Sequence, residues 1–132
     1  MNEMASRWLA FAKEDLQMAQ LAMKERLYNQ ACFHTQQGAE KALKALIAER
    51  GKLPPKTHKL IDLISILCMP ELEELRRDLL LLDRFYLPTR YPDALPGILA
   101  EALPTQEDAK VALEKATFVV DVCRQLLEGG TQ

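Results

Sequence analysis

The chain has 132 residues, a formal net charge of −2, and 48% hydrophobic and 27% charged residues. This length fits one domain that builds its own core, and the composition is that of a folded rather than a disordered protein. The charge balance excludes a polycation that coats nucleic acid, but it does not exclude a local basic patch. There is no run of 18 apolar residues and no basic stretch followed by an apolar one at the start. We therefore expect no membrane span and no secretory signal.

The three cysteines, Cys32, Cys68 and Cys123, are far apart in the sequence and lie among apolar residues. Their odd number and spacing favour reduced thiols packed as small hydrophobic side chains over a disulfide framework or a zinc site. The sequence also has no phosphate-binding glycine loop, His-Glu-x-x-His motif or Gly-x-Ser-x-Gly motif. We therefore expect a cytoplasmic protein with no metal, no cofactor and no catalytic residues of its own.

Glycine and proline divide the chain into segments with helical periodicity. The first predicted helix covers about residues 6–26, with Ser6 as its N-cap. The second covers about residues 29–50 and ends at Gly51. One face of the first helix collects apolar residues at spacings of three and four: Trp8, Ala12, Leu16, Ala19 and Met23.

Three further helices are predicted after Gly51. The third begins near Thr57, an acceptable N-cap, and the fourth begins at Pro70, a residue suited to a first helical turn. Residues 87–104 are expected to be non-helical, and the last helix follows Thr105, which with Asp108 forms a helix-start pattern. Residues 1–132 are thus predicted to form one all-α domain, an antiparallel bundle of four or five helices. The fourth helix carries a narrow apolar seam for a partner helix: Leu72, Leu75, Leu79, Leu82 and Tyr86.

A first candidate binding surface is one side of the second predicted helix. His34, Gln37, Lys41 and Lys44 follow one another at spacings of three and four, with Glu40 beside them. Such a line of polar and basic groups can bind phosphate. It is also typical of a solvent-facing helix side with ion pairs such as Glu40–Lys44, and both interpretations stay open.

A second candidate is the basic turn that follows this helix. Residues 41–59 contain six Lys or Arg and one acid, and His58 and Lys59 lie at the predicted start of the third helix. Unpaired backbone N–H groups and the helix dipole attract anions at such a position. The alternative is that His58 caps the helix or packs locally.

A third candidate is the aromatic and arginine-rich stretch at residues 83–93. Guanidinium groups beside aromatic rings suit phosphate pairing and base stacking. The alternative is a rigid connector whose tyrosines fill the end of the bundle and whose Arg90–Asp93 pair closes a turn. The candidate residues of this stretch are Arg84, Tyr86, Arg90, Tyr91 and Asp93.

Four stretches of the sequence, taken in order, resemble signatures of the HEPN family, a nucleotide-binding helical domain of higher eukaryotes and prokaryotes. They are residues 8–16, residues 31–45, Thr-His-Lys-Leu at 57–60, and the Tyr-x-x-x-Arg-Tyr-Pro-Asp pattern at 86–93. This resemblance covers most of the chain and implies a helical bundle that self-associates as a dimer or higher oligomer.

The resemblance implies two kinds of activity. Some members of the family are metal-independent ribonuclease toxins that use an Arg followed by a His after four to six intervening residues. Neither Arg84 nor Arg90 is followed by such a His. Other members accompany a minimal nucleotidyltransferase, so we expect a non-catalytic nucleotide-binding module paired with such an enzyme in a toxin–antitoxin-like system. A ribonuclease toxin that binds RNA and a purely structural oligomeric module are the alternatives.

Under the leading interpretation, basic side chains meet phosphate and aromatic side chains contact the base. Arg90, Lys41 and Lys44 take the first role, and Tyr86 and Tyr91 take the second. Asp93 orients Arg90.

Overall fold

The computed structural model describes residues 1–86 and 103–129, and every regular element in these ranges is a helix. This confirms the all-α prediction, while most of the stretch predicted to be non-helical lies outside the described residues. The helices are α1 (Glu3–Lys24), α2 (Tyr28–Glu49), α3 (Leu60–Leu67), α4 (Pro70–Glu73), α5 (Arg76–Asp83) and α7 (Gln106–Gly129).

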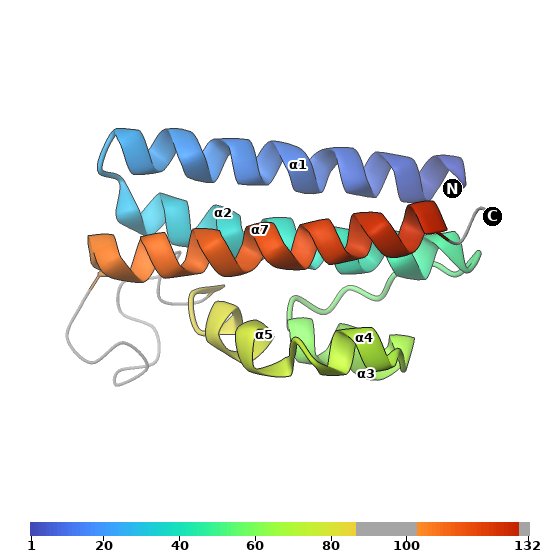
Figure 1. Ribbon diagram of the computed structural model, residues 1–132. Helices are drawn as coiled ribbons and strands as arrows, with labels where there is room; N and C mark the ends of the chain where they lie inside the picture. Colours follow the sequence, from blue (N-terminus) through green and yellow to red (C-terminus); the bar gives the residue numbers. More distant parts are fainter. Residues whose placement is uncertain (87–102, 130–132) are drawn as a thin grey trace.

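In the described part of the chain, the bundle consists of three long helices and one segment of short helices, arranged as Figure 1 shows. Helix α2 runs opposite to α1 and in the same direction as α7, because α3, α4 and α5 lead the chain back between them. Helix α2 contacts α1, α7, α3 and α5. Within the described residues, the fourth position of the bundle, for which the sequence predicted two helices, is therefore filled by three short ones.

The short helices are separated by local backbone features. Helix α3 ends at Cys68, whose φ of 51° lies in the left-handed region, and Pro70 then opens α4. Helix α4 is only four residues long, and Leu75 has non-helical backbone angles before α5 begins. The predicted seam spans α4 and α5 and is confirmed, because its four leucines are buried while Tyr86 is partly buried.

The long helices pack closely because small residues line their contacts. At Gly38 a Cβ atom would lie 3.3 Å from both the Ala12 carbonyl oxygen and a Leu16 methyl carbon, so α1 approaches the α2 backbone at this point. The predicted core face of α7 is confirmed, since all of its members are buried: Ala109, Ala112, Ala116, Val119, Val120, Cys123 and Leu127.

Helix ends agree in part with the sequence-based predictions. Gly51 follows α2 with φ +76°, and Thr105 and Asp108 exchange backbone-to-side-chain hydrogen bonds of 3.1 and 2.9 Å at the start of α7. Ser6 is not the N-cap of α1, because the helix begins one turn earlier. Asn2 caps it by accepting from the Ala5 N–H at 2.8 Å, while the Asn2 amide donates to the Ala48 carbonyl at 2.8 Å. The start of α1 is thereby tied to the end of α2.

The cysteines also agree in part with the predictions. Cys32 and Cys123 are buried, and burial raises the pKa of each thiol to about 12. Cys68 is exposed, which corrects the expectation that all three pack in the core.

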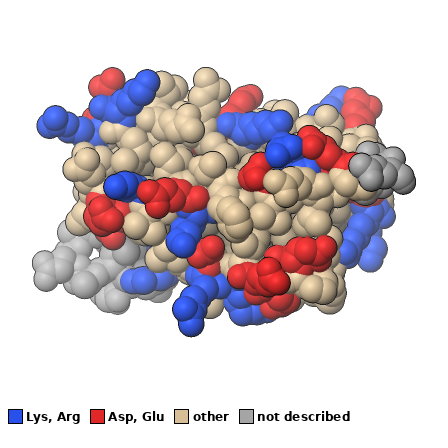
Figure 2. Space-filling view, in the orientation of Figure 1, with Lys and Arg blue, Asp and Glu red and all other residues tan. Residues whose placement is uncertain are grey.

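Among the described residues, no helix is both long and apolar enough to cross a bilayer. Figure 2 shows acidic and basic side chains interspersed on one face of the molecule, so this face has no field of a single sign.

Candidate functional site

The start of α3 is capped from within the chain. The Asp83 carboxylate, on α5, accepts the Leu60 N–H at 2.9 Å and the Ile61 N–H at 3.3 Å. Burial raises the pKa of Asp83 above its ordinary value despite these hydrogen bonds. The helix start that the sequence offered to an external anion is therefore occupied by this carboxylate. Thr57 is not the N-cap, since its hydroxyl donates to Asp62 at 2.8 Å.

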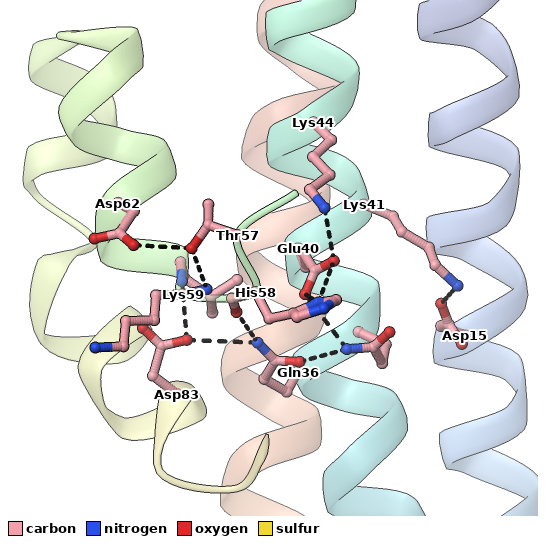
Figure 3. A network of polar contacts seen from close by, with 12 residues as sticks. Asp15, Gln36, Glu40, Lys41, Lys44, Thr57, His58, Lys59, Asp62 and Asp83 are labelled. Carbon is pink, nitrogen blue, oxygen red and sulfur yellow. Dashed lines mark hydrogen bonds and ion pairs between the residues drawn. The ribbon is translucent and has the colours of Figure 1, made fainter. Parts of the chain in front are cut away.

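Gln36 connects α2 to this capped helix start. Its side chain is fully buried, and its amide nitrogen donates to the His58 carbonyl at 2.7 Å. The same nitrogen lies 3.4 Å from an Asp83 oxygen, and the Gln36 oxygen accepts from Gln37 at 2.7 Å. Three separate parts of the chain are thus joined through one buried amide (Figure 3).

The buried carboxylate of Glu40 is the centre of a second set of contacts. It accepts from Lys44 Nζ at 3.0 Å and lies 3.2 and 3.3 Å from His58 Nδ1. Since an ionised carboxylate only accepts hydrogen bonds, Nδ1 carries the hydrogen in this contact. Figure 3 shows Lys44 and His58 converging on Glu40.

The position of Lys44 corrects the expectation that it meets a phosphate. Its exposed fraction is 5% and that of Glu40 is 3%. The Lys44 ammonium also lies 5.6 Å from the centroid of the Trp8 ring on α1, which suits a cation–π contact. The Glu40–Lys44 pair named as an alternative in the sequence does form, but it lies in the interior rather than on a solvated side.

Asp15 on α1 pairs with two other members of the predicted line on α2. It accepts from His34 Nδ1 at 2.9 Å and from Lys41 Nζ at 2.6 Å. Burial by itself would raise the pKa of Asp15, but these hydrogen bonds and the two neighbouring charges outweigh it and hold the pKa below its ordinary value. In Figure 3 Lys41 points toward Asp15 and away from the cleft described next. The charge of Lys41 is thus used to join two helices.

A cleft of about 340 Å³ opens beside the start of α3. On one wall the His58 ring stacks on the Tyr86 ring, with centroids 4.8 Å apart and planes inclined by 25°. The His58 side chain is 52% exposed, and because Nδ1 contacts Glu40, Nε2 is the ring nitrogen left for the cleft. The full lining is Thr57, His58, Lys59, Asp62, Asp83 and Tyr86.

An adjoining hollow of about 530 Å³ shares part of this lining. Lys59, Asp62 and Asp83 border both spaces, and Arg84 and Leu80 border the second. The structure therefore brings the predicted residues His58, Lys59, Arg84 and Tyr86 into one region. Gln37 reaches it only indirectly, through Gln36 and Glu40. His34 and Lys41 lie at the other contact of α2, and three predicted residues fall outside the described part of the chain: Arg90, Tyr91 and Asp93.

Sequence reasoning missed Asp83 and Gln36 as parts of this site. Each forms a hydrogen bond with a residue more than twenty positions away in the sequence, so no local spacing pointed to them. The sequence feature that could have pointed to Gln36 was a pair of glutamines, Gln36 and Gln37, inside an alanine-rich helix.

Within residues 1–86 and 103–129, no three or more His, Cys, Asp or Glu side chains are grouped so that they could hold a metal ion.

Comparisons with solved structures agree with this fold and span nearly the whole chain. The crystal structure of TT1696 from Thermus thermophilus is 35% identical, with a TM-score of 0.79, and the match covers 95% of this chain and 98% of that one. The archaeal HEPN homologue ST0689 is 26% identical, with a TM-score of 0.74 and coverages of 96% and 99%. A HEPN domain protein from Thermotoga maritima is 28% identical, with a TM-score of 0.72 and coverages of 92% and 98%.

Sequence comparison agrees with the structural result. A protein of Methanocaldococcus jannaschii, "Putative toxin MJ1304", is 27% identical over 135 residues, covering 94% of this chain and 88% of that protein. The family model described as HEPN domain matches residues 5–126. The helical bundle, these relatives and the extent of that match show that the chain belongs to the HEPN domain family.

Proposed function

We propose that this chain is a HEPN module that binds a nucleotide, or the nucleotide of a partner, in the cleft beside the start of α3. The observation that carries the proposal is the stacked pair of His58 and Tyr86 with Lys59 at the same cleft. A flat aromatic surface binds a base by stacking, worth about 1–3 kcal/mol per base, and an ammonium pairs with a phosphate.

The charges of the cleft favour a nucleotide with few phosphates. Lys59 is accompanied by the carboxylates of Asp62 and Asp83, and a chain of several phosphates would meet both. Asp83 is engaged by the α3 backbone, while Asp62 accepts one hydrogen bond from Thr57, so it can accept another from a ribose hydroxyl or a base amine. We therefore expect a nucleoside monophosphate to bind more tightly than the triphosphate.

Arg84 and three residues that follow Tyr86 in the sequence complete the proposal. Arg84 borders the adjoining hollow and is the second candidate for pairing with phosphate. Arg90, Tyr91 and Asp93 keep the roles given to them under the leading interpretation of the sequence: Arg90 meets phosphate, Tyr91 contacts the base and Asp93 orients Arg90. Lys44 has no part in the proposal because it is enclosed, and His34 and Lys41 have none because both contact Asp15.

Calorimetric titration with AMP, GMP and ATP tests the proposal. We expect saturable binding that weakens by at least about tenfold in Lys59→Ala, since a hydrogen bond to a charged group contributes about 1.5–3 kcal/mol. Lys56→Ala is the matched control, because this exposed lysine lies three residues earlier and does not line the cleft. No saturable heat up to millimolar ligand, or equal weakening in both variants, would contradict the proposal.

The partner that we propose is a minimal nucleotidyltransferase, in a toxin–antitoxin-like pair. Support comes from family membership and from the name of the Methanocaldococcus jannaschii relative. Purification of the chain from its own cells, followed by identification of bound protein and nucleotide, tests this. A transferase found in the complex would support the pair, and a self-associated chain without protein partner or nucleotide would count against it.

A metal-independent ribonuclease is the second candidate function, and the Glu40–His58 contact favours it. A buried carboxylate that holds Nδ1 leaves Nε2 of His58 in the cleft as a base for the 2′-hydroxyl of RNA, with Lys59 beside it. Incubation with RNA in the presence of a chelator tests this, with His58→Ala expected to lose the cleavage and Lys56→Ala to keep it. Absence of cleavage by the unaltered protein would rule against this candidate.

A further inference from the structure

The carboxylate of Asp62 is an acceptor of the cleft with unused hydrogen-bonding capacity. The other carboxylate there, Asp83, is engaged by two backbone N–H groups at the start of α3 and by Gln36. Asp62 accepts a hydrogen bond from Thr57 at 2.8 Å through Oδ2. Since an ionised carboxylate has about four acceptor positions on its two oxygens, both Asp62 oxygens keep capacity for a ligand.

Thr57 fixes the direction of this carboxylate. Its hydroxyl oxygen accepts the Lys59 N–H at 3.2 Å, and its single hydrogen is donated to Asp62. Figure 3 shows one Asp62 oxygen turned toward Thr57 and the other turned away from it. Asp62 lies in the first turn of α3 and is exposed, so the held carboxylate is open to a ligand in the cleft.

The common bases differ in how their hydrogen-bonding edges meet such a carboxylate. Guanine carries two neighbouring donors, N1–H and N2–H₂, which the two oxygens of one carboxylate can accept together. Adenine and cytosine place a ring nitrogen acceptor beside their amino group, and uracil places carbonyl oxygens on both sides of its N–H. Each of these acceptors is repelled by a carboxylate oxygen that faces it. A fixed carboxylate that contacts the base edge therefore favours guanine.

The other residues of the cleft suit the remaining parts of a guanine nucleotide. The stacked rings of His58 and Tyr86 line the same cleft as Asp62, so a base that packs on these rings can turn its edge to the carboxylate. The cleft volume of about 340 Å³ is at the low end of small-molecule sites, which span about 300–1,000 Å³. The cleft therefore suits the base and sugar, and the phosphate extends toward Lys59 and Arg84 at the adjoining hollow.

We propose that Asp62 makes the cleft selective for guanine by accepting N1–H and N2–H₂ of the base. This inference rests on the proposed nucleotide binding and names the base that the site selects. Ribose hydroxyls are the competing donors for Asp62, but every ribonucleotide carries them, so a contact with the sugar would give no preference among bases. A bidentate contact between a side chain and a base edge discriminates against other bases by about fivefold or more.

Calorimetric titration with GMP, IMP, AMP and CMP measures the selectivity. We expect GMP to bind about tenfold more tightly than AMP or CMP. IMP, which keeps N1–H and lacks the amino group, should fall between GMP and AMP. If no nucleotide binds, the proposed function itself fails, and this inference fails with it. If AMP binds at least as tightly as GMP and Lys59→Ala weakens both, the nucleotide site stands and the guanine inference is overturned.

Asp62→Asn tests the residue directly and should not disturb folding, because Asp62 is exposed. The amide replaces one acceptor with an N–H₂ donor, which opposes the guanine donors and complements xanthine, whose N1–H lies beside a carbonyl oxygen. We expect the variant to lose the preference for GMP over AMP and to bind XMP at least about fivefold more tightly than the unaltered chain does. Glu71→Gln is the matched control, because it removes an exposed carboxylate in the first turn of α4 that lines neither space, and it should change no affinity.

The Thr57 hydroxyl provides a second test that leaves the carboxylate in place. Thr57→Val removes the group that holds Asp62 and should reduce the preference for GMP, whereas Thr57→Ser keeps the hydroxyl and should retain it. The inference is overturned if Asp62→Asn keeps the preference for GMP. It is also overturned if Asp62→Asn weakens GMP, AMP and CMP equally, which is the result expected of a contact with the sugar.

Discussion

Removal of the Glu40 carboxylate is the most informative single change to the interior. Lys44 is 5% exposed, and in Glu40→Ala its ammonium loses the carboxylate oxygen 3.0 Å away. Breaking a buried ion pair from one side costs about 3–5 kcal/mol, because an uncompensated charge remains in the interior. The entropy of unfolding is about 2.1 cal/mol/K per residue, or about 0.28 kcal/mol/K for this chain. A loss of about 4 kcal/mol then lowers the melting temperature by about 14 °C.

Thermal unfolding followed by circular dichroism measures this loss, with two further variants for comparison. Glu40→Leu combined with Lys44→Met replaces both charges with apolar groups of similar size and should recover most of the stability. Glu73→Ala breaks an exposed pair with Arg76 and should leave the midpoint unchanged within error. A Glu40→Ala midpoint within about 3 °C of the unaltered protein, or a double variant as unstable as the single one, would refute the reasoning.

Three other predictions follow from the described contacts. Asp83→Ala should lower the free energy of unfolding in urea by about 2 kcal/mol, because the α3 backbone loses its cap, and a loss below about 0.5 kcal/mol would show that water replaces the carboxylate. Since the pKa of Asp15 is lowered in the folded protein, its contribution is complete above the ordinary value of 3.8 and is lost as the pH falls below it. Urea unfolding from pH 5 to 2 should therefore show a shallower loss in Asp15→Asn than in the unaltered chain, and equal slopes would contradict this. A thiol reagent should modify one cysteine, Cys68, in the native protein and all three after denaturation, whereas rapid native modification of either buried thiol would contradict the burial.

The helices could be predicted from the sequence because their signals are local. A glycine that adopts φ +76° after α2 and a Thr-x-x-Asp pattern at the start of α7 act within a few residues. The prediction that Ser6 caps α1 was wrong because Asn2, four positions earlier, also accepts a hydrogen bond from a first-turn N–H. The contact of Asn2 with Ala48 on α2, 46 positions away, is not encoded in any local pattern.

The candidate site was less predictable because its contacts are distant in the sequence. The cap of α3 comes from Asp83, 23 positions after the N–H that it accepts. Lys44 was expected on a polar side of the second helix, but α2 is covered by helices on several sides, so a polar position on it need not face solvent. The joint position of His58 and Tyr86 also depends on how α3 and α5 pack, which spacing along one helix does not encode.

The central place of α2 has a consequence for the rate at which backbone amides exchange with solvent. Fourteen of its 22 residues are buried, compared with six of 22 in α1. Amides of a helix enclosed by its neighbours exchange only when the whole domain opens, whereas a helix at the edge exchanges through smaller openings. Deuterium uptake along α2 should therefore report the global free energy of unfolding, while α1 exchanges earlier. A partner that covers α1 would remove this difference and make the two helices exchange as one unit.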